Sequence, residues 1–147
     1  MKIEVQRLNQ AYHFEAVNED GARSHIDADP GIGGENQGLR PMQLLLAGLA
    51  GCSAIDIGLI LHKQRLTIDD LHITVEADRQ QDRVPALFER IHIHYSLQGD
   101  LPPAQVGRAV ALSLDKYCSV AHILRATAPI TYTYAVNDIT YGPDAAP

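Results

Sequence analysis

The sequence has no tryptophan, two phenylalanines and two cysteines among its 147 residues. Its 12 lysines and arginines form no basic run, and the formal net charge is −6. Because phosphate groups are bound by basic patches, this charge argues against a nucleic acid as partner. Residues 1–7 lack the apolar core of a signal peptide, so we expect a cytoplasmic protein. Two cysteines in such a chain indicate thiols or a redox pair rather than a disulfide scaffold.

The residues that are present suffice for one domain with a packed core. Apolar residues make up 46% of the chain and charged residues 20%, as in an ordinary soluble protein. Alternating patterns predict strands, and longer apolar patterns predict helices. The predicted order is a β-meander over 1–27, a loop over 28–40, a central helix over 41–65, strands over 71–98, a second helical region over 102–126 and a final strand over 128–136. We therefore predict a single α+β domain over residues 1–147.

The predicted loop over 28–40 is rich in glycine but lacks the lysine of a phosphate-binding loop. We expect it to be a flexible connector. The apolar segment 44–61, which follows it, is long enough to suggest a membrane span. It contains Asp56 and three glycines, however, and a charge at the centre of a bilayer is costly. We therefore predict a fully buried helix of a soluble protein, with no membrane partner.

Cys52 lies in this helix, and Asp56 follows one turn later on the same face. A nearby carboxylate and an apolar environment both disfavour a thiolate. A reactive Cys52 would therefore need a cation from elsewhere in the fold, and otherwise it would serve only in packing. The candidate cations are Arg23, Arg40, Lys116 and His122.

Cys118 has a different setting, in the segment Asp115-Lys116-Tyr117-Cys118. If Asp115 caps a helix that begins near Lys116, Cys118 lies in the first turn, where unpaired backbone N–H groups stabilise a thiolate. The alternative is a thiol packed under Tyr117. Sequence pattern alone leaves both interpretations open.

His92 and His94 share one face of a predicted strand, a spacing that can bind a metal. Zinc sites usually have three or four protein ligands, and no third ligand stands at a matching distance in the sequence. We therefore expect solvent-facing histidines, no metal site and no cofactor.

These residues resemble the OsmC/Ohr family of osmotically induced and organic hydroperoxide resistance proteins. The resemblance rests on Pro41 followed eleven residues later by Cys52, on the surrounding segment LLLAGLAGCSAIDI, and on KYCSVAHIL around Cys118. It implies an intertwined homodimer in which two central helices are wrapped by antiparallel β-sheets from both subunits. The sites would then lie at the dimer interface.

The resemblance also implies a thiol-dependent peroxidase that acts on organic hydroperoxides. Cys52 would attack the peroxide, and its sulfenic acid would condense with Cys118 to form a disulfide. A reducing dithiol, of lipoyl type or another thiol, would restore both thiols by exchange. The alternative is a non-catalytic dimer of the same fold that binds a ligand or senses redox state.

One position departs from the family's pattern. Peroxidase members usually have a glutamate directly after the helix-opening proline, paired with an arginine that activates the first cysteine, whereas this chain has Met42. The nearest acid upstream is Glu35, and the arginine would be Arg23 or Arg40. Asp56 with Lys116 or His122 is an alternative network.

Overall fold

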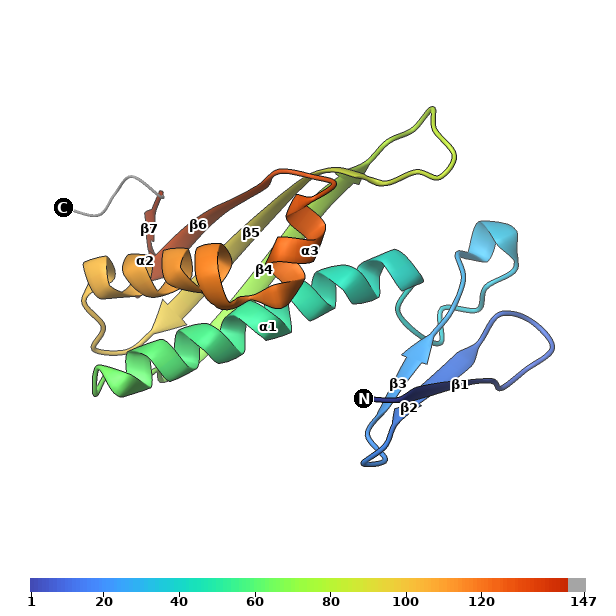
Figure 1. Cartoon of the computed structure of the whole chain (residues 1–147), viewed down its shortest axis with the longest axis horizontal. Coiled ribbons are helices and arrows are strands. Elements are labelled where there is room, and N and C mark those ends of the chain that lie inside the picture. The colour runs from blue at the N-terminus through green and yellow to red at the C-terminus, as the bar shows by residue number, and fades with distance from the viewer. Residues whose placement is uncertain (143–147) are drawn as a thin grey trace. The chain divides into compact units, whose positions relative to one another are not determined.

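The structure, a computed structural model, describes residues 1–142 (Figure 1). It divides into two compact units, and the boundary between them along the chain falls within one long helix. The first unit runs from Met1 to Leu46, and the second begins at Ala47.

The first unit is built on an antiparallel meander of three strands: β1 (Ile3–Arg7), β2 (Phe14–Asn18) and β3 (Arg23–Ile26). Gly21, with φ of 83°, provides the left-handed residue in the turn between β2 and β3, where a side chain would be strained.

The glycine-rich segment after β3 is tied down, so the expectation of a flexible connector was wrong. Asp27 is 1% exposed, and its carboxylate accepts hydrogen bonds from the backbone N–H groups of Ala28 (2.7 Å), Glu35 (3.0 Å) and Gln37 (3.0 Å). These bonds lower the pKa of Asp27, with the bond from Gln37 as the largest cause. One buried carboxylate therefore organises the whole loop, a role that glycine content does not reveal.

The helix α1 spans Pro41–Lys63 and begins with proline in its first turn, where the missing N–H costs nothing. Gln43 accepts a hydrogen bond from the backbone N–H of Arg40, at 3.0 Å, as half of a capping box. In length and composition α1 resembles a membrane span, but buried helices of soluble proteins pass the same test.

Only one stripe of α1 is buried, so the predicted burial on all sides was wrong for the single chain. The buried positions are four residues apart: Leu49, Ser53, Ile57 and Leu61. Ile55 remains 66% exposed and Leu59 56% exposed. One chain covers only one side of this helix, and an apolar side is left without a partner.

The second unit contains a four-stranded sheet in the order β4 (Asp70–Arg79), β5 (Phe88–Gln98), β6 (Ile130–Val136) and β7 (Ile139–Tyr141). β5 and β6 are parallel, so this sheet is mixed rather than wholly antiparallel. A parallel pair needs a long crossover, which α2 (Pro103–Leu112), the π-helical turn η2 (Ser113–Tyr117) and α3 (Ser119–Arg125) provide. The short strand β7 was not predicted; it returns through Asn137 and Asp138, both at positive φ, as in a tight hairpin.

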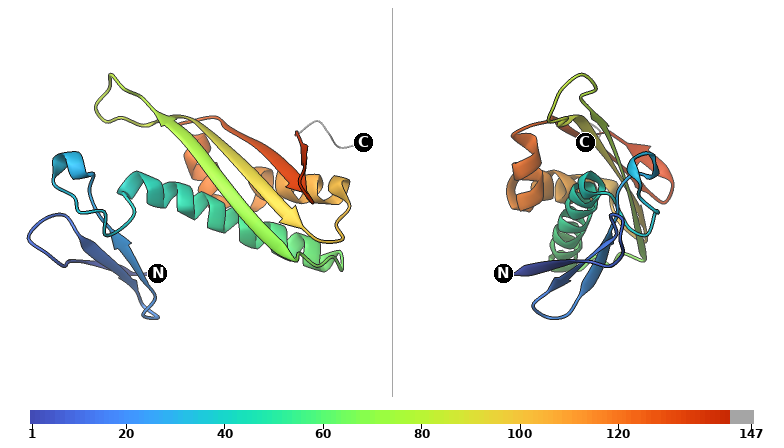
Figure 2. Two further views of the ribbon diagram at one scale, coloured as in Figure 1. Left: turned by 180° about the vertical axis from the view of Figure 1, so that it is seen from behind. Right: turned by 90° about the vertical axis from the view of Figure 1, so that its right-hand side faces the viewer.

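In the second unit, α2, α3 and the later part of α1 all lie against one face of the sheet (Figure 2). β5 alternates accordingly: Ile91, Ile93 and Tyr95 are buried toward the helices. His92 and His94 alternate with them and make contacts with Thr133 on β6. The core of this unit therefore lies between the sheet and the helices, and the thiols lie within that layer.

Candidate active site

The fold brings Cys52 and Cys118 together, although they come from α1 and from the junction of η2 and α3. The two Sγ atoms and a carboxylate oxygen of Asp56 all lie within 4.8 Å of one another. Both cysteines are free thiols; Cys52 is half-buried and Cys118 is fully buried. A partly accessible thiol thus stands beside an inaccessible one.

Cys118 directly follows the π-helical turn η2, which interrupts the helical segment between α2 and α3. Asp115 lies inside this turn and does not cap a helix. Instead Cys118 is itself the N-cap of α3, and its Sγ accepts a hydrogen bond from the backbone N–H of Ala121 at 3.4 Å. The helix therefore begins three residues later than the predicted start at Lys116, and Cys118 precedes its first turn.

The pKa of Cys118 is raised to about 12, first by burial and then by the neighbouring Cys52 thiol. The backbone N–H groups of Ala121 and Val120 lower the pKa of Cys118, but by less than burial and Cys52 raise it. Cys118 is therefore a neutral thiol at physiological pH.

Asp56 is held by Ser113 of η2, whose Oγ donates a hydrogen bond to Oδ2 at 3.1 Å. Within residues 47–142 no ion pair joins Asp56 to a basic side chain. Lys116 instead places its ammonium 5.3 Å from the centre of the Tyr117 ring, and His122 is exposed. Ser113 was missed at the sequence level because a lone serine in a helical segment carries no motif.

Tyr95 of β5 was also missed as a site residue. Its side chain is fully buried, and its hydroxyl has no hydrogen-bond partner among the described residues. Burial is the main cause that raises its pKa; a contact with Ser53 partly offsets this, and the nearby Cys118 and Cys52 add to it. The strand alternation predicted that Tyr95 faces inward but not what it faces.

The remaining candidates, Arg23, Arg40 and Glu35, belong to the first unit. Arg23 forms an ion pair with Glu15, and Arg40 pairs with Asp29 at 2.8 Å. Glu35 accepts a hydrogen bond from Asn9 at 3.0 Å. Within this unit, neither arginine is paired with Glu35.

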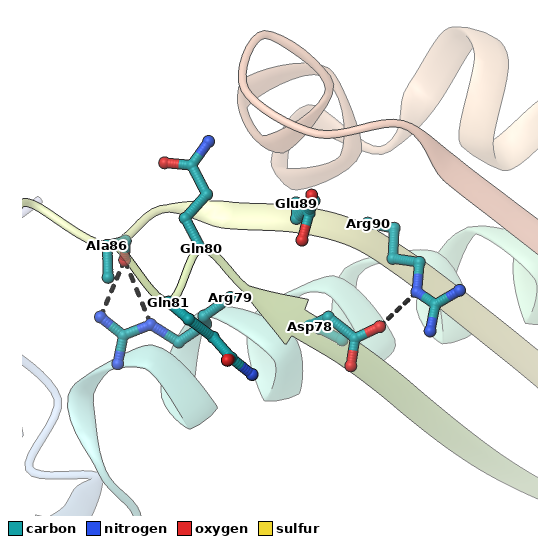
Figure 3. Close-up of a pocket in the computed structure, with 8 residues that line it drawn as sticks. Asp78, Arg79, Gln80, Gln81, Ala86, Glu89 and Arg90 are labelled. Atoms are coloured by element: carbon teal, nitrogen blue, oxygen red, sulfur yellow. Dashed lines mark hydrogen bonds and ion pairs between the residues drawn. The ribbon is translucent and has the colours of Figure 1, made fainter. Parts of the chain in front are cut away.

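Two pockets of the second unit differ in what lines them. A pocket of about 360 Å³ opens beside Asp56 and has mostly apolar walls, formed by Leu59, Ile60, Leu112 and Tyr117 with Lys63 and Gln64. A larger pocket, of about 790 Å³, lies where β4 and β5 meet their connecting turn (Figure 3). There Arg79 donates to the carbonyl of Ala86, and Asp78 pairs with Arg90. Neither cysteine lines either pocket, but the smaller one includes Asp56, whose carboxylate lies within 4.8 Å of both sulfurs. The smaller pocket is therefore the candidate for substrate access.

Comparisons with known proteins agree on one family. The sequence model of the OsmC-like proteins matches residues 34–133. Protein YhfA of Escherichia coli K12 is 42% identical over 97 residues, which are 65% of this chain and 72% of YhfA.

Solved structures show the same fold. A hypothetical protein from Aquifex aeolicus VF5 has a TM-score of 0.79 and 29% identity, over 92% of this chain and 95% of that one. An organic hydroperoxide resistance protein OsmC from Legionella pneumophila has a TM-score of 0.69 and 20% identity, over 92% of this chain and 98% of that one. The identity to the second structure supports a shared fold alone.

Proposed function

The chain belongs to the OsmC-like protein family, and from this premise we propose that it is a thiol peroxidase that reduces organic hydroperoxides through Cys52 and Cys118. The observation that carries the proposal is the pairing of the two thiols, whose Sγ atoms lie within 4.8 Å of each other. The resemblance of the segments around Cys52 and Cys118 to the OsmC/Ohr family is the basis for the choice of substrate class.

The different burial of the two thiols suits two different roles. Cys52 is the accessible one, so its thiolate attacks the distal peroxide oxygen; the O–O bond breaks and the alcohol leaves after taking a proton. Cys52 becomes a sulfenic acid, oxidised by two electrons. The buried thiol of Cys118 then condenses with this sulfenic acid, which releases water and forms a disulfide. A cellular dithiol, of lipoyl type or another thiol, returns two electrons by exchange.

The pocket beside Asp56 suits the organic part of such a substrate. Leu59, Ile60 and Leu112 present apolar walls, and burial of apolar surface is the main contribution that a hydroperoxide's hydrocarbon chain can make to binding. No metal or flavin is needed for these steps.

Activation of Cys52 requires a cation, since Asp56 lies nearby without a basic partner in the second unit. Met42 cannot hold an arginine by charge. We therefore propose Arg23 or Arg40 as the activating cation, with Glu35 as the acid that would hold it, and Lys116 and His122 as secondary candidates for the cation.

The assembly we propose is a homodimer with the two α1 helices at its centre. Ile55 is 66% exposed in the single chain, although it belongs to an apolar helix. A second copy of α1 would cover it and remove this apolar surface from water.

The test is to mix reduced protein with cumene hydroperoxide, in the presence of a chelator, and count free thiols. We expect two thiols lost per chain and one intramolecular disulfide. Cys52→Ser should lower the rate by about 10³-fold or more, as loss of a nucleophile does in other enzymes. Cys118→Ser should react once and leave a sulfenic acid on Cys52. Unchanged thiols under excess peroxide, or turnover that survives Cys52→Ser, would refute the peroxidase.

A second candidate, a non-catalytic ligand-binding or redox-sensing dimer, is favoured by the carboxylate of Asp56 beside both thiols. It predicts that iodoacetamide modifies Cys52 at neutral pH no faster than it modifies free cysteine. In the peroxidase, by contrast, Cys52 should react faster than free cysteine. In both cases Cys118 should be modified only after unfolding, because it is buried and protonated.

A further inference from the structure

Two thiols and one carboxylate converge in the second unit. Cys52 and Asp56 stand one turn apart on α1, and Cys118 meets them from the start of α3. Among residues 1–142, this is the one group of three or more cysteine, histidine or acidic side chains close enough to share a metal ion.

We propose that the reduced Cys52–Asp56–Cys118 cluster is a Zn²⁺ site with one open coordination position. Zinc binds thiolate sulfur at about 2.3 Å and carboxylate oxygen at about 2.0–2.2 Å, so neighbouring ligand atoms of a tetrahedral site lie about 3.5–3.8 Å apart. All three ligand atoms already lie within 4.8 Å of one another. Small side-chain rotations would close the remaining gap.

The local charges favour a cation. Within residues 47–142 no ion pair offsets the charge of Asp56, and the two thiols would become thiolates only when they coordinate a metal. A bound Zn²⁺ supplies the missing positive charge, and coordination itself deprotonates a thiol. Two thiolates select Zn²⁺ over hard cations such as Mg²⁺, and the carboxylate disfavours Cu⁺.

Two neighbouring groups are placed as the outer shell of a metal site. Ser113 Oγ donates to one oxygen of Asp56 and so fixes the carboxylate, as outer-shell partners of metal ligands do. The buried hydroxyl of Tyr95 also faces this region, beside Ser53.

The cluster is open to a pocket on the side of its carboxylate. Cys52 and Asp56 are half-buried, and the apolar pocket of about 360 Å³ opens beside Asp56. With three protein ligands, the fourth position of the zinc would hold water or a small thiol that enters by this pocket.

This inference goes beyond the proposed peroxidase, because it requires only the reduced cluster. Binding would release the two thiol protons to solvent and involve no change of oxidation state. While zinc is bound, neither sulfur is free to react with peroxide, so zinc would hold the protein in a protected form.

The test uses the reduced full-length chain, freed of any tag, with Co²⁺ as a spectroscopic probe and Zn²⁺ as competitor, without peroxide. We expect one Co²⁺ per chain, a thiolate-to-cobalt charge-transfer band with the visible bands of tetrahedral cobalt, and displacement by Zn²⁺. Binding without the thiolate band, or one metal per two chains, would overturn the proposal.

Asp56→Asn is the decisive variant, since it keeps the size of the side chain and an oxygen for Ser113. It should weaken Zn²⁺ binding by at least about tenfold, the smallest loss usual even for an outer-shell partner. The matched control is Asp115→Asn on η2, an exposed carboxylate paired with Arg125 at 3.0 Å, which should bind like the wild type. Equal affinity of wild type and Asp56→Asn would refute the site.

The two proposals can fail separately. The peroxide assay contains a chelator, so it reports the thiols alone, whereas the metal titration contains no oxidant. Protein that binds Zn²⁺ but ignores cumene hydroperoxide would retain the metal site and lose the peroxidase. Protein that consumes peroxide but gives no thiolate–cobalt band would do the reverse.

Discussion

At the scale of single residues, Asp27 shows how one buried carboxylate orders a loop of low complexity. Its pKa is lowered by backbone N–H donors, so its contribution to stability is present above the unfolded value of about 3.9 and is lost as pH falls through the lower folded value. We predict that Asp27→Asn frees the loop over 28–40 at neutral pH. Hydrogen exchange at the amides of Glu35 and Gln37 measures this directly.

The pH dependence provides the control for this prediction. In the wild type, protection of these amides should fall below about pH 4, and the difference from Asp27→Asn should shrink there. Asp20→Asn, in the exposed turn after β2, should change neither the protection of these amides nor its dependence on pH. Equal protection in Asp27→Asn and wild type at neutral pH would show that the carboxylate does not organise the loop.

At the scale of elements, α2 packs against β6 through a glycine. A Cβ on Gly107 would meet Tyr134 Oη at 2.5 Å and Cζ at 2.8 Å. We predict that Gly107→Ala destabilises the fold, because overpacking costs about 1–3 kcal/mol and exceeds the helix-propensity gain of about 0.8–1 kcal/mol. Denaturant unfolding checks this prediction.

Two further variants separate sterics from propensity. Gly58→Ala on α1 meets no atom within 4 Å in the single chain, so helix propensity alone should make it stabilise the monomer. Tyr134→Phe removes the nearest clashing atom, and its buried hydroxyl has no partner among the described residues, so it should recover part of the loss caused by Gly107→Ala. Purely additive effects would contradict a direct contact between the two side chains.

At the scale of the whole molecule, α1 is too apolar to remain half exposed. A dimer would hide its free side, and stable interfaces bury about 1,200–2,000 Å². We predict a solution mass of about twice the chain's 16.1 kDa by light scattering. Ile55→Glu should shift the protein toward monomer, because Ile55 is 66% exposed in the single chain and the change would bury an unpaired charge in the dimer.

Val84→Glu is the matched control for the dimer prediction. Val84 is fully exposed in the turn between β4 and β5 and does not belong to α1. A charge at this position should therefore leave the solution mass unchanged. A wild-type protein that is monomeric at micromolar concentration would contradict the dimer, as would an Ile55→Glu variant that is still dimeric.

Local patterns were enough to predict much of this protein. Alternation and apolar spacing predicted the strands and helices, because each reflects the geometry of a single element. The segments around Cys52 and Cys118 carried the family resemblance, which the comparisons support over residues 34–133. Asp56 was also predictable as a neighbour of Cys52, since four residues in a helix make one turn.

What only the tertiary structure decided are the contacts between elements distant in sequence. The sulfur of Cys118 reaches Asp56 because η2 turns the chain back onto α1, and a π-helical turn leaves no simple signature in spacing. Ser113 and Tyr95 entered the site in the same way, through the packing of η2 and β5 around the thiols. Periodicity specifies which side of an element faces inward, but packing decides which atoms it meets there.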